Sequence, residues 1–427
     1  MLSLQGLLRK LLIGTVVITL VFLAGLVTYA MAVIYPPPDG VWLKNGEISG
    51  GDFLAFYTGG TLYCNEADRL YDLARQVTFQ KTLLGGSLGS LSSPLPFIYP
   101  PLVAAFFCPL SHFAFERAFY TTAIVALLCG LFALFALSRQ YTLPFNHGYS
   151  AVLLATLGFM PFYLNTVFGG QLAWLGIVIF ASFAMLLLKK QYVLSGAVLA
   201  LGYYKPPLFV LAALYFAIRL GWPFIKGGLL SALVLSALSV AAVGIDGLSH
   251  YVATASTYTY GQEFMPSVHL SPSQGAGVFA LTTSLLSISS ENLGLYFALC
   301  ISLLALSILK TVQRAVVTPT EIALVITASV GLSVWCMKYD LAILLVPFLL
   351  FVCDFQRVES KIKYAVIILI CGFYVEYWWR EETLFGVTLS LSSVLFLLLI
   401  AAFYSIVAKN GSAPKPSMFP KQLEPGN

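Results

Sequence analysis

The sequence predicts an all-α protein that crosses a lipid bilayer many times. Only 10% of its 427 residues are charged and 59% are hydrophobic, whereas a soluble domain carries about 25% charged residues. Apolar runs long enough to cross a bilayer recur from Leu11 to Ala408. We therefore expect one membrane domain over residues 1–410 and a disordered cytoplasmic tail at 411–427. The net charge of +5 does not indicate a nucleic-acid partner.

The first apolar run has some features of a secretory signal. Arg9 and Lys10 precede it, and the small-residue sequence Ala-Met-Ala follows it at 30–32. Its apolar core, residues 11–29, is too long for a cleaved signal, and many further apolar runs follow. We therefore expect a retained first membrane helix.

The seven cysteines indicate neither a disulfide framework nor a zinc site. Six of them lie inside apolar runs, where cysteine behaves as a small hydrophobic residue. Cys64 is the one cysteine that we expect outside the bilayer. Because the number is odd and no metal-ligand spacing is present, we predict no disulfide.

Lysine and arginine side chains predict the topology, because cytoplasmic loops collect them. If every basic group lies inside, an even number of crossings separates each neighbouring pair. The groups are Arg9/Lys10, Arg139, Lys189/Lys190, Arg219/Lys226, Lys310/Arg314, Arg357/Lys361/Lys363 and Lys409. After Arg139 they are joined in pairs by the apolar runs 149–168, 171–188, 191–204, 206–221, 223–245, 293–310, 318–337, 340–353, 362–379 and 383–406.

The beginning of the chain requires a segment that does not cross. Three apolar stretches, 11–34, 97–113 and 117–138, separate the first two basic groups. The middle stretch is short and contains prolines at 100, 101 and 109, so we interpret it as a re-entrant or interfacial segment. The prediction becomes roughly twelve spans with both termini in the cytoplasm. Runs 191–204 and 206–221 are short for a hydrocarbon core of about 30 Å.

This topology places several costly polar residues on the same, outer side. Ionisable groups at or within a membrane are functional candidates by default. Each one alone could instead be a snorkelling or solvated side chain, but their convergence on one face favours a site. The residues are Asp52, Gln171, Lys205, Lys338, Asp340, Glu376 and Arg380.

Two outer loops are long enough to cover such a site. The first, residues 35–96, contains apolar patterns near 53–57 and 70–84 that predict short amphipathic helices on the membrane surface. The second, residues 246–274, is rich in tyrosine, which suits either sugar stacking or a membrane-interface belt. A metal site is a weaker alternative for this second loop; its ligands would be Asp246, His250, Glu263 and His269.

The motifs along the chain resemble those of glycosyltransferase family 87, whose members use polyprenol-phosphate sugars. "GDFLAFYTGGTLYCNEADRLYD" at 51–72 is similar to the segment after the family's first helix, and "FIYPPLVAAFFCPLS" at 97–111 to its Tyr-Pro-Pro segment. Residues 169–211 resemble its Gly-Gln turn, basic bend and Lys-Pro, and "SPSQGAG" at 271–277 a weaker polar signature. Near residues 336–350 the family tends to have a histidine where Lys338 stands here.

The resemblance implies a GT-C fold, a bundle of membrane helices whose catalytic loop lies outside the cytoplasm. The expected partners are a polyprenyl-phosphate sugar donor, with mannose the first candidate, a glycolipid or glycan acceptor, and the lipid bilayer. We expect the protein in the cell inner (plasma) membrane with its active site on the outer face. No cofactor is expected, although a divalent metal is not excluded. The chain contains no Walker A motif and no Asp-x-Asp of nucleotide-sugar enzymes.

Sugar transfer from a polyprenyl phosphate needs a general base and cations for the departing phosphate. Asp52 is the candidate base, and its alternative role is an N-cap of the following helix. Lys205, Lys338 and Arg380 are the candidates for phosphate. The remaining substrate-binding candidates, of which Tyr99 and Gln171 could equally lock the loop, are Tyr57, Tyr99, Gln171 and Asp340.

The alternative class is a lipid or small-molecule transporter or flippase. Transporters often contain internal repeats and broken helices near the bilayer midplane. We find no repeat between the two halves, and the polar residues gather at one face. The sequence therefore favours the transferase.

Overall fold

The computed structural model is a helical protein with one short β-hairpin. It describes residues 17, 41, 48, 50–86, 94–140, 148–257, 275–279, 281–282, 296, 300, 316–376, 382–384 and 387–409. The expected first helix, the expected span at 293–310, most of the second outer loop, Arg380 and the tail lie outside these residues.

The described elements follow one another in this order. The first half contains α2 (Phe53–Asn65), η2 (Ala67–Arg69), α3 (Leu73–Leu83), α4 (Pro101–Phe107), η3 (Cys108–His112), α5 (Phe115–Ser138), α6 (Gly148–Leu157), the π-helix η4 (Pro161–Phe168), α7 (Ala173–Leu188), α8 (Tyr192–Ala200), η5 (Leu201–Tyr204), η6 (Pro206–Leu208), α9 (Val210–Leu220) and α10 (Trp222–Thr257). The second half contains α13 (Pro319–Gly331), η9 (Lys338–Leu344), α14 (Leu345–Asp354), η10 (Phe355–Arg357), α15 (Ser360–Glu376), β1 (Glu382–Leu384), β2 (Val387–Leu389) and α16 (Leu391–Lys409).

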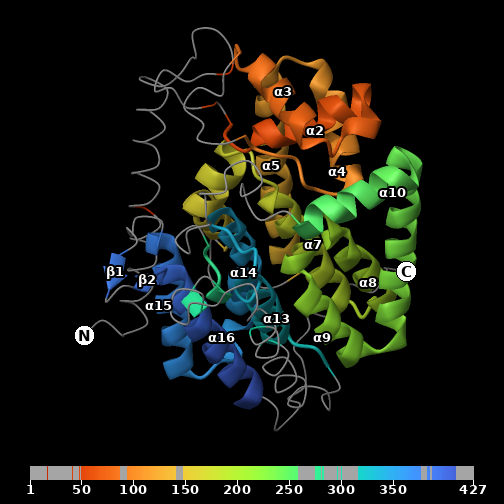
Figure 1. Cartoon of the computed structure of the whole chain (residues 1–427). Helices are drawn as coiled ribbons and strands as arrows, with labels where there is room; N and C mark the ends of the chain where they lie inside the picture. Colours follow the sequence, from red (N-terminus) through yellow and green to blue (C-terminus); the bar gives the residue numbers. More distant parts are fainter. Residues whose placement is uncertain are drawn as a thin grey trace, which may run out of the picture.

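The helices form a bundle with a cap at one end (Figure 1). The cap consists of α2, α3 and α4, which contact one another and rest on α5 and α10. Below it, α7 packs against α5, α8 and η9, and α13 packs against α9, α14 and α16. The cap therefore brings the first outer loop onto the same end of the bundle as the start of α7 and the start of η9.

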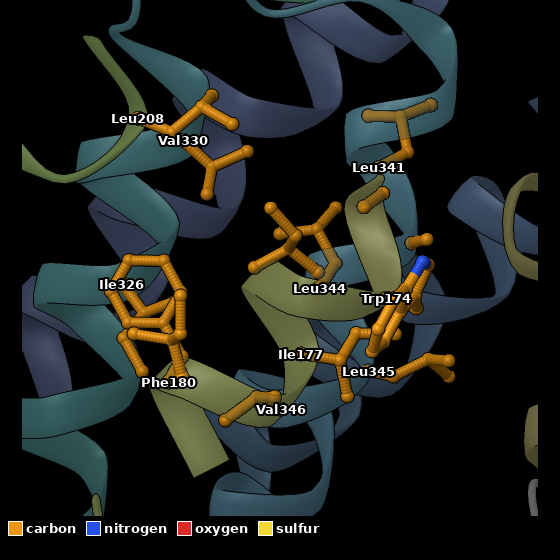
Figure 2. Packing of buried hydrophobic residues seen from close by; sticks show 14 of the residues in the cluster. Trp174, Ile177, Phe180, Leu208, Ile326, Val330, Leu341, Leu344, Leu345 and Val346 are labelled. Carbon is orange, nitrogen blue, oxygen red and sulfur yellow. The ribbon is translucent and has the colours of Figure 1, made fainter. Parts of the chain in front are cut away.

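The core below the cap is continuous and apolar. Figure 2 shows Trp174, Ile177 and Phe180 of α7 against side chains of α13, η9 and α14. Phe180 also stacks on Phe209 with 4.5 Å between the ring centroids. Truncation of such fully buried aromatic residues typically costs 3–5 kcal/mol, so this core holds α7 and η9 at a defined separation.

Three described helices are long and apolar enough to cross a membrane: α5, residues 222–255 of α10, and α16. A fourth span is possible if η4 and α7, which are bent by 119° at their junction, are one broken span. The helices α8 and α9 fall below the length of a span, as their runs predicted. The composition of these helices is that of a membrane protein, and the number of twelve spans stays a prediction.

The segment expected to be re-entrant contains only short helices. It comprises α4 and η3, and together they are too short to rank among the candidate spans. Pro100 precedes α4, and Pro101 occupies its first position, where the missing backbone N–H costs nothing. That the segment enters the membrane and returns without crossing stays a prediction.

The helix α2 is not the surface helix that the sequence predicts. Residues 53–60 and Leu62 are buried, because α4 and η3 pack against α2. Gly60 lies so close to the Phe107 backbone that a Cβ atom there would approach its carbonyl oxygen to 2.7 Å. α3 buries two amides, Gln76 and Gln80, rather than an apolar stripe.

A disulfide joins Cys64 near the end of α2 to Cys108 at the start of η3. The prediction of no disulfide was therefore wrong. Cys108 belongs to an apolar run and was treated as a membrane residue, but this run folds back against α2 instead. The two residues are 44 positions apart in sequence with 5.5 Å between their Cα atoms.

Two further boundaries differ from the predictions. Residues 246–257, expected in the second outer loop, continue α10 past a kink at Gly244, whose φ is +72°. Figure 1 shows this last part of α10 turning beneath α4. The expected span 383–406 begins instead with the hairpin β1–β2, and its helix starts at Leu391.

Candidate functional site

Two pairs of glycines meet at the centre of the candidate site. Gly50 and Gly51 form a turn with φ of +76° and +50° directly before α2, and Gly170 has φ of +67° directly before α7. These backbone conformations are disfavoured for residues with a Cβ atom. A Cβ atom on Gly170 would lie 2.5 Å from Phe53 Cβ and 2.7 Å from the Gly50 carbonyl oxygen. The two turns are therefore in direct contact.

This contact brings Asp52 and Gln171 together. Each is the first non-glycine residue after its turn, and the Gln171 amide Nε2 donates a hydrogen bond to Asp52 Oδ2. The residues are 119 positions apart in sequence. Asp52 is partly buried and Gln171 is only 5% exposed. The Gly-Gly-Asp and Gly-Gly-Gln motifs are thus two halves of one structure.

Asp52 does not act as a side-chain cap of α2. It occupies the N-cap position, but its carboxylate accepts no hydrogen bond from the first turn of the helix. The carboxylate faces Gln171 instead. Burial raises the pKa of Asp52, while the Gln171 hydrogen bond and the Lys205 charge act in the opposite direction. This environment is that of a carboxylate suited to accept a proton.

Lys205 lies within electrostatic reach of Asp52 and forms an ion pair with Asp340. Its Nζ is 2.5 Å from Asp340 Oδ2, and the two side chains are only 13% and 1% exposed. The backbone N–H of Met337 donates a second hydrogen bond to the Asp340 carboxylate, at 2.8 Å. Lys205 follows η5 and precedes the prolines of η6, which restrict its backbone.

The ring of Tyr339 completes the surroundings of Lys205. The ammonium lies 4.5 Å from the ring centroid and 3.5 Å from the hydroxyl oxygen. Tyr339 was not among the residues predicted from the sequence, although its position between the candidates Lys338 and Asp340 was a usable signal. Aromatic faces attract cations, so the Tyr339 ring is a favourable neighbour for the Lys205 side chain.

A third motif reaches the same place. Gly275 forms an isolated antiparallel bridge with Met337, and the N–H of Ala276 donates to the Cys336 carbonyl oxygen at 2.8 Å. The polar signature at 271–277 therefore ends beside the backbone that leads into Lys338. Glu376, at the end of α15, is buried and lies within electrostatic reach of the Cys336 thiol. It therefore lies near the same backbone segment.

The two tyrosine candidates, Tyr57 and Tyr99, have mainly structural surroundings. The Tyr57 hydroxyl donates to the Phe113 carbonyl oxygen at 2.8 Å, and Tyr71 donates to the carbonyl oxygen of Tyr99 at 2.9 Å. The ring of Tyr99 packs on Phe56 with 4.9 Å between the ring centroids. Tyr57 thus locks η3 to α2, while Tyr99 is half-buried and still presents part of its surface.

The remaining candidates separate into two groups. Lys338 begins η9 and is half-buried, on the same short segment as Asp340. Arg380 lies outside the described residues. The same is true of Glu263 and His269, two ligands of the alternative metal site. Within the described ranges, the one group of side chains with metal-ligand spacing is Cys64, Cys108 and His112, of which the two cysteines form the disulfide.

An open depression of about 520 Å³ lies elsewhere, on the exposed side of the cap. It is lined by Glu66, Arg69, Asp72, Ala74, Arg75 and Thr78. Arg75 pairs there with Glu66, and both side chains are about one third exposed. Exposed pairs of this kind contribute little to stability, and the depression contains none of the candidate residues. We therefore assign the site to the Asp52–Lys205 region.

The model of glycosyltransferase family 87 matches residues 97–347, more than half of the chain. The matched range contains Tyr99, Gln171, Lys205, Lys338 and Asp340 and begins after Asp52. No curated protein and no solved structure matches the chain.

Proposed function

The chain belongs to glycosyltransferase family 87, and on that premise we propose that it transfers a hexose from a polyprenyl-phosphate donor to a glycan or glycolipid acceptor. Membership of the family makes the protein a membrane glycosyltransferase. Mannose is the first candidate for the sugar. The proposed acceptor and donor meet on the non-cytoplasmic side of the membrane.

One observation carries this proposal: a carboxylate, an amide and an ammonium from three distant segments converge at one end of the bundle. Asp52 lies on Gln171, and Lys205 lies within electrostatic reach of Asp52 while paired with Asp340. Charged side chains are rarely brought into such surroundings for stability alone, because burial of an ion pair barely repays its desolvation. The arrangement supplies one base and one cation.

The proposed reaction uses these two groups directly. Asp52 accepts the proton of the acceptor hydroxyl while that oxygen forms a bond to the anomeric carbon of the donor sugar. The bond from this carbon to the phosphate oxygen breaks, and the polyprenyl phosphate leaves with the electron pair. Lys205 stabilises the negative charge that develops on the phosphate. The proton ends on Asp52 and returns to solvent after product release.

Asp340 has a supporting role in this scheme. Its carboxylate holds the Lys205 ammonium at 2.5 Å, so the lysine side chain is already in position before the donor binds. A lysine acts toward phosphate as a point charge with rotatable donors. It can therefore contact a phosphate oxygen without leaving Asp340.

The disulfide supports the proposed side of the membrane. Disulfides persist in oxidising compartments and are rare in the cytosol. Cys64 and Cys108 both belong to the cap, and the cap carries Asp52. A cap that forms a disulfide is expected on the outer face, in agreement with the distribution of basic residues.

The test is a transfer assay with protein in lipid nanodiscs. Polyprenyl-phosphate mannose, glucose and arabinose, each radiolabelled in the sugar, are supplied in turn with a membrane lipid extract. We expect one donor to yield a labelled glycolipid, and Asp52→Asn to yield none above background. Label that enters no product with any donor, or that enters product equally with the variant, would contradict the proposal. Accumulation of intact donor across a vesicle membrane would instead support the transporter.

A further inference from the structure

Gln171 differs from the other buried glutamines of this region. Gln76 and Gln80 are also almost fully buried, and both ends of each amide are satisfied. The Gln76 amide donates to the carbonyl oxygens of Leu70 and Phe97 and accepts from the Phe97 N–H. Gln80 accepts from the Leu95 N–H and donates to the Leu95 carbonyl oxygen. These two glutamines tie α3 to residues 95–97.

The Gln171 amide is satisfied at one end only. Its Nε2 donates to Asp52, while its Oε1 is buried and has no hydrogen-bond partner among the described residues. A buried acceptor without a partner is costly and rare in native proteins. The orientation of the amide follows from chemistry, because an ionised carboxylate can only accept and the NH₂ group must face it.

A further unsatisfied polar atom lies close to Gln171 in the sequence. Trp174 Nε1, on the second residue of α7, is another buried polar atom without a hydrogen-bond partner in the described part of the chain. Gln171 thus presents an unpaired acceptor oxygen beside the candidate base, and Trp174, three residues further along the chain, has an unpaired donor. Gln171 is held by the glycine turns and by its N–H, which donates to the Thr166 carbonyl oxygen at 3.1 Å.

We propose that Gln171 is the positioning residue of the transfer site and that it selects acceptors with two adjacent hydroxyls. Its NH₂ group holds Asp52 Oδ2, so that Oδ1 is the oxygen that receives the proton. Its Oε1 accepts a hydrogen bond from the hydroxyl next to the attacking one. Adjacent hydroxyls of a pyranose are separated by about one hydrogen-bond length, so acceptor oxygens on two neighbouring side chains can bind such a pair. The part of this inference that concerns acceptor hydroxyls rests on the proposed function. The orientation of Asp52 by Gln171 does not.

The first experiment tests the orientation of Asp52 without any turnover. The protonation of Asp52 is titrated by infrared spectroscopy in nanodiscs, with its band assigned by subtraction of Asp52→Asn in each background. Among the described residues, the groups that influence this carboxylate are Gln171 and Lys205. Gln171→Leu removes a hydrogen bond to the ionised form, so the midpoint should rise by about one pH unit or more.

A matched variant separates this effect from loss of packing. Gln76→Leu removes another buried amide that has no recorded contact with Asp52, and it should leave the midpoint unchanged. Gln171→Glu keeps the size of the side chain and should raise the midpoint further, because two adjacent carboxylates share a proton. An unchanged midpoint in both Gln171 variants, with gel filtration showing folded protein, overturns the orientation of Asp52 by Gln171.

The second experiment tests the acceptor half. Octyl α-mannoside and its monodeoxy analogues serve as acceptors with radiolabelled polyprenyl-phosphate mannose. In the wild type, removal of the hydroxyl next to the attacked one should slow transfer at least about 10-fold, since it leaves Oε1 unpaired. Gln171→Leu should use both acceptors at similar, reduced rates. A variant that discriminates as the wild type does overturns hydroxyl selection by Gln171.

The two experiments separate failure of the inference from failure of the function. If wild-type protein transfers no sugar with any donor or acceptor, the proposed function and the acceptor role of Gln171 both fall. The infrared titration still decides whether Gln171 orients Asp52. If transfer occurs but the midpoint does not move, the function stands and the positioning role is wrong.

Discussion

Asp52 is surrounded by groups from distant parts of the chain. Gln171 donates to its carboxylate, Lys205 reaches it electrostatically, and Gly170 packs under its turn. Each of these neighbours has a separate physical effect. The amide orients, the ammonium favours the ionised form, and the glycine permits the close approach. Changes at single residues should therefore have distinguishable results.

Asp52→Asn should abolish most of the activity while the protein stays folded. Asparagine keeps the size of the side chain and can still accept a hydrogen bond from Gln171, but it cannot take up the acceptor proton. Loss of a general base typically lowers turnover by about 10²–10⁴-fold. The measurement is the initial rate of sugar transfer in nanodiscs, with thermal unfolding as the control. Near-normal turnover would contradict the catalytic assignment.

As the pH rises, ionisation of Asp52 should increase activity and decrease stability. Burial raises the pKa of this carboxyl above its usual value of 3.8, so kcat/KM should rise with pH through the raised pKa and then level off. Between the ordinary pKa of Asp52 in the unfolded chain and its raised pKa in the folded protein, the folded state binds more protons than the unfolded state. Stability therefore declines as pH rises through this window.

Asp52→Asn removes this ionisation, so its Tm should exceed that of the wild type at pH 8 by more than at pH 4. Thermal unfolding of both proteins at the two pH values checks the expectation. A difference in Tm that does not depend on pH, or that is larger at pH 4, would contradict the raised pKa.

Variants of the Lys205–Asp340 pair should show separate effects on stability and on catalysis. Lys205→Met keeps the aliphatic stem but leaves Asp340 buried without its cation, which typically costs about 3–5 kcal/mol. The double variant Lys205→Met/Asp340→Asn removes both charges and should recover much of the Tm. Its transfer rate should stay about 10²–10³-fold below that of the wild type, because the Lys205 ammonium no longer faces the leaving phosphate. Recovery of the rate together with the Tm would show that the pair is structural.

At the scale of elements, the site depends on two turns and on the cap that carries one of them. The turn before α2 and the turn before α7 meet through glycines, and the disulfide joins α2 to η3 at the far end of the cap. α2 is buried on nearly all sides, so it has little freedom to rotate. The position of Asp52 is therefore determined at both ends of this helix.

Gly170→Ala should separate the two turns. A Cβ atom there meets Phe53 at 2.5 Å and the Gly50 carbonyl oxygen at 2.7 Å, so α2 or α7 must move. Gly221→Ala is the matched control, since Gly221 has φ of +68° and nothing within 4 Å of the added atom. We expect the control to lose only the backbone term of about 1–3 kcal/mol, because the φ/ψ of +68°/−150° at Gly221 is adopted almost only by glycine, and to keep its transfer rate.

The rate of Gly170→Ala should fall by at least about 10²-fold, because small displacements of catalytic groups have effects of this size. Transfer assays and Tm values for the two variants are compared side by side. Equal behaviour of both would mean that the contact between the turns is unimportant for the site.

At the scale of the whole molecule, the arrangement in the membrane follows from composition and charge. The described candidate spans are apolar along their length, and α10 exposes a row of large apolar side chains that suit contact with lipid, including Leu229, Leu233 and Leu238. The cap, which carries the disulfide, gathers at one end of the bundle (Figure 1). These features predict one outer end and one cytoplasmic end.

The prediction that segment 97–113 is re-entrant can be tested by the sidedness of later loops. If it crossed fully, every later basic loop would lie on the outer side. Single cysteines are introduced at Arg139 and Lys189 in a protein whose free cysteines are replaced by serine. A membrane-impermeant maleimide applied to intact cells should label neither position until the membrane is opened. Labelling of both positions from outside would refute the topology.

The sequence by itself determined the class of the protein, because hydrophobicity and charge act locally. Low charge and long apolar runs indicate membrane helices wherever they occur, and the glycines before Asp52 and Gln171 mark turns that other residues disfavour. The positions of α5, α7 and α13, the shortness of α8 and α9, and the family followed from such local patterns.

Only the tertiary structure decided which distant residues meet. Asp52 and Gln171 are 119 positions apart, and Lys205 and Asp340 are 135 positions apart, so their pairing depends on how α7, η9 and the cap pack. The missed disulfide has the same cause, since Cys108 looks like a membrane residue until α4 folds back on α2. Packing between elements buries α2 and satisfies Gln76 and Gln80 while Gln171 retains an unpaired oxygen. The glycines before Gln171 mark a turn, but they do not show that its amide keeps an unpaired oxygen.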